Sequence, residues 1–218
     1  MAKTTAPLLS FGADGQIAKT AVYSKWKGIP YVRRYTIPAN PRTTKQMVTR
    51  NMFRTLNQMW LLMPGVGKEP WNARATGQPF TGVNAFIKAN IDGVDTSAPP
   101  TDWALFKGSA GAKGGLPPAS LALVPAAGQI TATLGAPPIP TDWTIAEAQG
   151  IAFLDGDPQV DFVGTIQAQT DATAGPYALV FTGLTAASDY VVSAWFKWNR
   201  PDGTFAYSTS LTDIDTTP

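Results

Sequence analysis

The pattern of hydrophobic positions changes period along this chain. Residues 17–26 and 31–36 are rich in Thr, Val, Tyr and Trp, and the break between them at residues 27–30 predicts a β-hairpin. Beyond Pro41, apolar residues recur every three or four positions up to Met63, which predicts an amphipathic helix over 43–63. Thr43 and Gln46 form a capping pair for its first turn. Two shorter helices are expected over 70–75 and 81–90.

From Ala119 onward the period becomes two, which favours strands. Seven short strands are predicted, over 120–124, 129–135, 143–154, 160–167, 177–182, 190–198 and 204–211. This spacing is typical of an antiparallel β-sandwich of immunoglobulin type. The expected fold class is therefore two-domain, with a small N-terminal α+β domain (a β-hairpin plus helices) and a C-terminal all-β sandwich.

Charge divides the chain in the same way. Residues 1–95 carry 13 Lys and Arg against 4 Asp and Glu, whereas residues 96–218 carry 4 against 11. Because a Gly- and Pro-rich stretch lies at the change, we expect a basic domain at 1–95, a linker at 96–117 and a sandwich at 118–218. The basic half favours an anionic partner, either an acidic protein surface or a nucleic acid.

Composition excludes several chemistries. The sequence has no Cys and no His, so disulfides and His-dependent triads cannot form within one chain and standard zinc sites are nearly excluded. Glu69 and Glu147, the only glutamates, fall in different predicted domains, which argues against a hydrolytic pair of carboxylates. We therefore expect no enzymatic activity and no cofactor. Because no segment approaches ~20 apolar residues and no signal-peptide core is evident, we expect cytoplasmic synthesis and no membrane span.

Basic residues are interleaved with aromatic ones in the N-terminal half. The partner-binding surface is expected to comprise Lys25, Trp26, Lys27, Arg33, Arg34, Arg42, Arg50 and Arg54. This mixture suits phosphates and bases as well as an acidic protein surface, and a solvated basic face is the alternative. Arg50 and Arg54 are one helical turn apart and repel each other unless something anionic covers them. The Met and aromatic stripe of the same helix, with Trp60 and Trp71, is expected in the core.

A block of motifs in this half resembles a known family. The motifs are Gly15-Gln16-Ile17, Tyr23-Ser24-Lys25-Trp26-Lys27-Gly28-Ile29-Pro30-Tyr31-Val32-Arg33, Asn40-Pro41-Arg42-Thr43 with Gln46, Arg50 and Phe53, then Trp71 and Gly82-Val83-Asn84-Ala85-Phe86-Ile87. Over residues 12–92 they resemble a family of uncharacterised proteins encoded by bacteriophages and prophages. The resemblance implies a structural component of the virion, in contact with other capsid or tail proteins and with copies of itself.

A second resemblance covers residues 117–216. Leu184 precedes Tyr190 by six residues in a segment that is similar to the fibronectin type III domain before and within its strand F. The resemblance implies that the Tyr190 hydroxyl closes a tyrosine corner. It also implies a spacer or adhesive module. Ile130 stands where that family usually has a Trp.

Three further patterns have a structural interpretation that we favour over a functional one. Glycines surround Lys113 as in a phosphate loop, but no Gly-Lys-Ser/Thr follows, so a flexible linker is expected. Carboxylates that alternate along the chain can hold calcium. The sequence has three such aspartates, Asp155, Asp157 and Asp161, for which we favour a solvated turn. Three tryptophans could bind glycans but are expected in the core; they are Trp143, Trp195 and Trp198.

The leading hypothesis is a non-enzymatic virion protein, a capsid decoration or minor capsid protein. Its basic domain would anchor on the particle, and its sandwich would project or bridge to a neighbour. A tail or head–tail connector component and a nucleic-acid-binding protein are the alternatives. Head or tail location, copy number and symmetry stay open at this stage.

Overall fold

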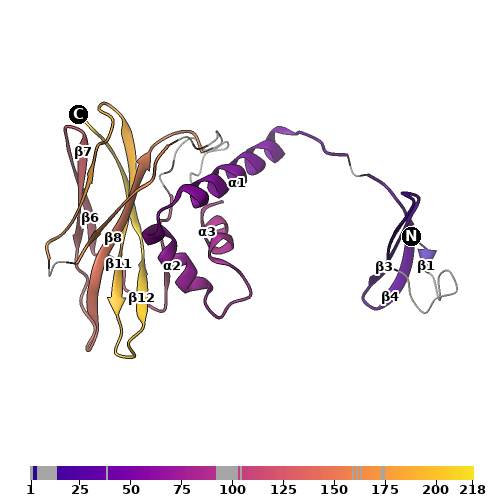
Figure 1. Cartoon of the computed structure of the whole chain (residues 1–218), viewed down its shortest axis with the longest axis horizontal. Coiled ribbons are helices and arrows are strands. Elements are labelled where there is room, and N and C mark those ends of the chain that lie inside the picture. Colours follow the sequence, from indigo (N-terminus) through magenta and orange to yellow (C-terminus); the bar gives the residue numbers. More distant parts are fainter. Residues whose placement is uncertain are drawn as a thin grey trace. The chain divides into compact units, whose positions relative to one another are not determined.

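The chain folds into two compact units, Met1–Arg42 and Thr43–Pro218. The computed structural model describes residues 2–3, 14–37, 39–91, 103, 105–158, 160, 162, 164–172 and 175–218. Figure 1 shows the order of the elements, from a small sheet through three helices to a β-sandwich. The boundary at Arg42 differs from the predicted one, which lay at 95–118.

The first unit is a four-stranded antiparallel sheet. Its strands are β1 (Ala2–Lys3), β2 (Gly15–Ile17), β3 (Ala21–Trp26) and β4 (Ile29–Arg34), in the order β1-β4-β3-β2. The predicted hairpin is confirmed as β3 and β4. Lys27 and Gly28 form its two-residue turn with φ of 49° and 80°, the left-handed pair that matches the twist of the flanking strands.

The second unit begins with three helices, α1 (Thr44–Leu62), α2 (Gly65–Ala75) and α3 (Gly82–Asn90). The predicted caps are present, because the hydroxyls of Thr43 and Thr81 accept hydrogen bonds from the third backbone N–H that follows each. Helix α2 starts earlier than predicted. Pro70 lies inside it instead of opening it.

Two antiparallel sheets form the sandwich. The smaller has the order β10-β7-β6, with β6 (Ser120–Ala126), β7 (Gln129–Gly135) and β10 (Tyr177–Thr182). The larger has the order β5-β12-β11-β8-β9, with β13 paired to β11; its strands are β5 (Ala110–Ala112), β8 (Thr144–Leu154), β9 (Gln167–Asp171), β11 (Asp189–Asn199), β12 (Phe205–Thr209) and β13 (Leu211–Thr216).

Three strand predictions differ from the structure. The strand predicted at 160–167 is absent from the described part of that segment, and β9 begins only at Gln167. The strand predicted at 204–211 is divided into β12 and β13, because the N–H of Ser210 bonds to the carbonyl of Ser109 instead of joining β11. That contact also brings β5, from the predicted linker, to the edge of the sheet.

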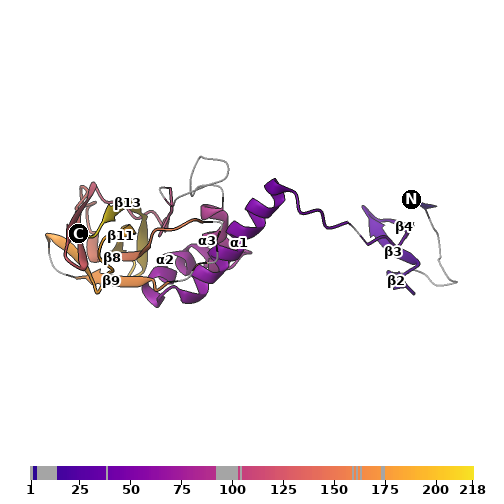
Figure 2. The same ribbon diagram turned by 90° about the horizontal axis from the view of Figure 1, so that it is seen from above.

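The large sheet has a hydrophobic core on each of its faces. One core lies between the two sheets and includes Phe181, Phe196 and Trp198. The other lies between the helices and the large sheet, and unites residues such as Leu56 and Phe86 with Trp195. Figures 1 and 2 show α2 and α3 beside this sheet. Strands β8 and β11 are therefore buried on both faces, in runs that do not alternate.

This second core explains why the predicted boundary is not seen. Trp103 and Phe106, from the predicted linker, are each only 2% exposed and belong to the same core as the helices. A Cβ on Gly67 of α2 would come within 3.3 Å of Ile151 on β8, so helix and sheet are in close contact. The helices thus fold with the sandwich and not with the N-terminal sheet.

Candidate assembly surface

The eight residues predicted to bind a partner are all exposed, but they do not form one site. Six belong to the first unit, namely Lys25, Trp26, Lys27, Arg33, Arg34 and Arg42, and two belong to the second, Arg50 and Arg54. Each group therefore has to be considered within its own unit.

The tip of the β3–β4 hairpin presents an aromatic side chain to solvent. Trp26 is 64% exposed, and the Lys27 Nζ lies 5.1 Å from the centroid of its ring. Lys25 precedes it on β3 and is also exposed. Exposed tryptophan is a residue type that interfaces favour, and the cation beside its ring attracts the ring's π electrons.

The two arginines of β4 point to opposite faces of the small sheet. Arg33 pairs with Val22 and Arg34 pairs with Ala21, and neighbouring residues on a strand alternate between faces. Val22, Trp26, Ile29 and Arg33 lie on one face, which we call the Trp26 face; Ser24 and Tyr31 share it. The predicted basic patch is therefore divided between the two faces of the sheet.

The described part of the first unit shows no buried core. None of its described side chains, at 14–37 and 39–42, is buried. Instead it exposes three isoleucines to a large extent, Ile17, Ile29 and Ile37. Sequence reasoning missed them because it looked for charge. The sequence did contain a sign of these exposed apolar residues, because apolar residues fall on both faces of these strands.

Helix α1 has one buried side and one exposed side. Met52, Leu56, Met59 and Met63 are buried as predicted, with Trp60 partly buried beside them.

The other side of α1 exposes the predicted Arg50 and Arg54 together with Phe53 and Leu61, the last 76% exposed. Arg54 Nη2 donates to Asn51 Oδ1 at 3.0 Å. This side thus mixes cations with large apolar side chains, as the Trp26 face does.

Two of the three aspartates considered for calcium lie in the described structure. Asp155 and Asp157 line a cavity of about 230 Å³ together with Thr55 and Trp103. Asp161 lies outside the described residues. Among the residues that the structure describes, no group of three potential metal ligands occurs.

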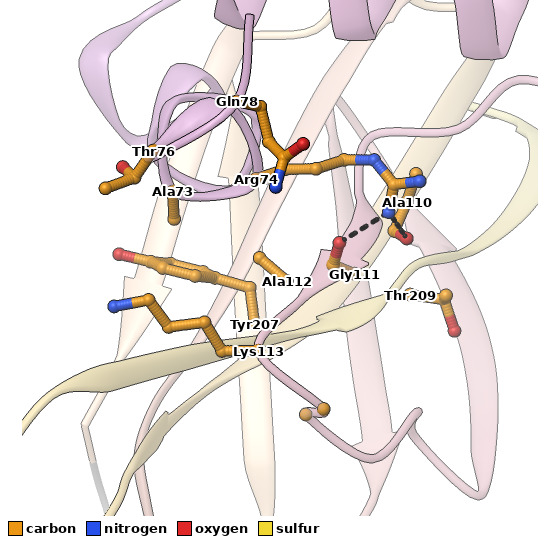
Figure 3. Close-up of a pocket in the computed structure, with 12 residues that line it drawn as sticks. Ala73, Arg74, Thr76, Gln78, Ala110, Gly111, Ala112, Lys113, Tyr207 and Thr209 are labelled. Carbon is orange, nitrogen blue, oxygen red and sulfur yellow. Dashed lines mark hydrogen bonds between the residues drawn. The ribbon is translucent and has the colours of Figure 1, made fainter. Parts of the chain in front are cut away.

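A cavity of about 490 Å³ lies where the end of α2 meets β5 and β12 (Figure 3). Arg74 Nη1 donates to the carbonyls of Ala110 and Gly111, both at 3.0 Å, and so ties α2 to β5. The glycine-rich segment around Lys113, predicted as a flexible linker, lines this cavity. A Cβ on Gly115 would lie 2.4 Å from the backbone carbon of Tyr207, so this segment packs directly on β12.

The two glutamates, expected in separate domains, are brought together by the structure. Lys197 Nζ on β11 lies 3.0 Å from Glu69 Oε2 on α2 and 3.1 Å from Glu147 Oε1 on β8. Gln149 Nε2 donates to the same two oxygens at 3.0 and 2.9 Å, and the Tyr207 hydroxyl donates to Glu69 at 3.1 Å. We call these five residues the Glu69 network. It joins α2 to three strands of the large sheet.

The electrostatics of the Glu69 network favour its charged form. Burial alone would raise the pKa of Glu69, but hydrogen bonds from Gln149, Lys197 and Tyr207, with the charge of Lys197, lower it below its ordinary value. Burial likewise opposes the charge of Lys197, yet the two carboxylates raise its pKa. Burial, and next the charge of Glu69, raise the pKa of Tyr207 far above its ordinary value.

Two donors lie between the carboxylates of this network. Lys197 and Gln149 each donate to both Glu69 Oε2 and Glu147 Oε1. These contacts hold α2 against the large sheet.

The three tryptophans considered for glycans contribute mainly to packing. Trp195 and Trp198 are fully buried, as predicted. Trp195 Nε1 donates to Gln149 Oε1 at 2.8 Å, and Trp198 Nε1 donates to the Leu116 carbonyl at 3.2 Å. Trp143 is half-buried against Trp198, with ring centroids 6.1 Å apart.

Comparisons with known proteins identify no family. No family model matches the chain, and no curated protein matches it. A solved structure titled "Myokine structure" is 10% identical to this chain, covers 48% of it and 99% of its own length, and gives a TM-score of 0.36. A likeness of this size carries no argument. No helix within the described residues is long and apolar enough to cross a membrane.

Proposed function

We propose that this chain is a non-enzymatic structural protein of a bacteriophage particle. The resemblance of residues 12–92 to proteins encoded by phages and prophages supports a location in the phage particle. The first unit anchors the chain on other virion proteins, and the sandwich projects or bridges to a neighbour. A capsid decoration or minor capsid role is favoured over a tail or head–tail connector role.

The observation that carries this proposal is the small sheet of the first unit, whose described side chains include no buried one. A small sheet reaches independent stability when it buries an apolar face, and none of the described side chains of this unit is buried. Trp26 and Ile29 are cross-strand neighbours and both are exposed, and an exposed apolar cluster beside polar residues is typical of an interaction site. A partner in an assembly provides a surface that covers such a cluster.

We infer that the sandwich is of fibronectin type III kind. The Tyr190 hydroxyl accepts a hydrogen bond from the N–H of Thr185 at 3.0 Å, the bond that defines a tyrosine corner, and Leu184 is buried beside it. The three-stranded sheet β10-β7-β6 stands against a larger one that contains β8, β9 and β11, as the two sheets of such domains do. This architecture suits a rigid spacer and supplies no chemistry by itself.

Particle incorporation tests the proposal. Phage particles that carry Arg33→Glu and Trp26→Ala in this chain should lose it on density-gradient purification, whereas particles that carry Lys113→Glu should keep it. Lys113 is exposed and belongs to the second unit, so it is a matched control for charge. Recovery of the unaltered chain only outside purified particles would refute the proposed function.

Nucleic-acid binding is the second candidate, favoured by the Lys27 cation over the exposed Trp26 ring. It predicts binding to single-stranded DNA or RNA that weakens steeply with salt, because phosphate contacts release counterions. Titration with a labelled 20-nucleotide oligomer at 50 and 200 mM NaCl decides it. Absence of binding at 50 mM removes this candidate.

A further inference from the structure

The Trp26 face needs a partner whose chemistry the chain itself defines. Along β3 and β4 this face places Trp26 beside Ile29, Ser24 beside Tyr31 and Val22 beside Arg33. These three cross-strand pairs follow one another along the face. The exposed Trp26 ring lies at one end and the exposed Arg33 cation at the other. A partner must cover apolar area and neutralise positive charge at the same time.

A second copy of the first unit does not meet this requirement. Residues 1–42 contain seven Lys and Arg but only one acidic residue, Asp14, a net charge of +6. Two such units placed face to face would repel each other. The partner surface is therefore acidic.

The sandwich of the same chain has the complementary charge. Residues 118–218 contain ten Asp and Glu but only two cations, Lys197 and Arg200. Both cations already form ion pairs, Lys197 with two glutamates and Arg200 with Asp202 at 3.0 Å. The whole second unit, residues 43–218, has 14 Asp and Glu against 10 Lys and Arg, so its net charge of −4 is opposite in sign to the +6 of the first unit.

We propose that the Trp26 face of one copy docks on the acidic sandwich of a second copy, head to tail. This deepens the proposed function by naming the partner and rests on it. Because the two contacting surfaces differ, each docked copy still offers a free sandwich and a free Trp26 face. Such heterologous contacts can continue from copy to copy into rings or open chains.

The size of the face sets the strength of the contact. Six-residue strands span about 20 Å and four strands about 19 Å, so one face covers at most about 400 Å². That lies below the roughly 800 Å² per partner of a stable interface, so a single contact is weak and gains from repetition in an assembly. Self-association should therefore appear at about 100 μM and weaken strongly with salt.

The experiment uses the full chain. Sedimentation velocity at 10–200 μM should show concentration-dependent species larger than a monomer in 50 mM NaCl, reduced at least fivefold in 500 mM NaCl. Arg33→Glu and Trp26→Ala should each abolish them, while Lys113→Glu, which changes the total charge as Arg33→Glu does, should leave them. A chain that stays monomeric at 200 μM in 50 mM NaCl overturns the inference, as does one that associates equally in both salts.

Cross-linking tests the head-to-tail arrangement without depending on how the variants fold. A carbodiimide applied to a 1:1 mixture of ¹⁴N- and ¹⁵N-labelled chains joins lysines to carboxylates in contact. Mixed-isotope links from Lys27, at the hairpin tip beside Trp26, to acidic residues within 118–218 support the inference. Their absence, or mixed-isotope links confined to residues 1–42, overturns it.

The two proposals fail in distinguishable ways. A chain that stays monomeric but is incorporated into particles leaves the proposed function standing and removes the self-docking. A chain that self-associates but is never found in particles keeps the self-docking and removes the virion role.

Discussion

Replacing Lys197 by Met tests whether the Glu69 network attaches the helices to the sandwich. The change removes the cation that bridges the carboxylates of Glu69 and Glu147. The Met side chain keeps an apolar stem near the Phe205 ring, which Lys197 Nζ approaches to 4.6 Å. The two carboxylates then remain close together without a positive charge between them.

The magnitude follows from burial. The side chains of Lys197, Glu147 and Glu69 are 15%, 23% and 38% exposed. Loss of one partner of a fully buried pair costs about 3–5 kcal/mol, whereas exposed pairs contribute about 0–1 kcal/mol. Because Glu69 is more than a third exposed, we expect a loss of about 2 kcal/mol in the free energy of unfolding at pH 7. For a unit of this size that lowers Tm by about 4–8 °C.

The pH dependence gives the prediction its sign. Because the pKa of Glu69 is lowered in the folded state, its contribution is present above its ordinary value and is lost as the pH falls through the folded-state pKa. The raised pKa of Lys197 keeps its contribution complete throughout this acid range, and it is lost only above the folded-state pKa. In the variant, acid instead relieves the repulsion between the two carboxylates. The difference in stability between the two proteins should therefore shrink from pH 7 to pH 4.

Urea unfolding followed by tryptophan fluorescence at pH 7 and pH 4 measures this difference, with Lys113→Met as the control. Lys113 is exposed, and no ion pair is found for it within the described part of the chain. An equal loss for both variants at pH 7, or a difference that does not change with pH, would refute the reasoning.

Three other substitutions test the packing. Gly115→Ala should cost about 3–5 kcal/mol or prevent folding, since its Cβ would meet β12 backbone at 2.4 Å, whereas Gly156→Ala, with open space around it, should be neutral in thermal unfolding. Tyr190→Phe should lose about 1–3 kcal/mol in urea unfolding because the N–H of Thr185 is left without its partner; an unchanged midpoint contradicts this. Leu56→Ala should cost about 2–5 kcal/mol and lower one transition shared by helix and sheet signals; a separate sandwich transition at the original midpoint contradicts the shared core.

Local patterns predicted the elements that local interactions determine. The β3–β4 hairpin, the caps at Thr43 and Thr81, and the buried stripe of α1 were all predicted, because turn chemistry and periodicity act over a few residues. The resemblance to the fibronectin type III domain implied that the Tyr190 hydroxyl bonds to nearby backbone, and the N–H of Thr185 does donate to it.

Long-range contacts account for what was not predicted. Glu69 and Lys197 are 128 residues apart, and no local signal connects them. Strands β8 and β11 contain runs of buried residues, a pattern that indicates a strand covered on both faces. We instead expected buried and exposed residues to alternate, as in a sandwich strand with one face in solvent. The composition of 96–117 suggested a linker, although Trp103 and Phe106 belong to a core. The candidate surface was found by charge, while the exposed isoleucines beside it were not.

The division of the chain at Arg42 has a consequence for recombination between genes. A crossover within 95–118 would separate Trp103 and Phe106 from Phe86, or the helices from Trp195, and leave two halves that each expose part of a core. A crossover near codon 42 would separate no buried pair among the described residues. We therefore expect natural hybrids to exchange the first 42 residues as a cassette, which requires only a short stretch of coding sequence. Reporter domains inserted by design should be tolerated at the same position.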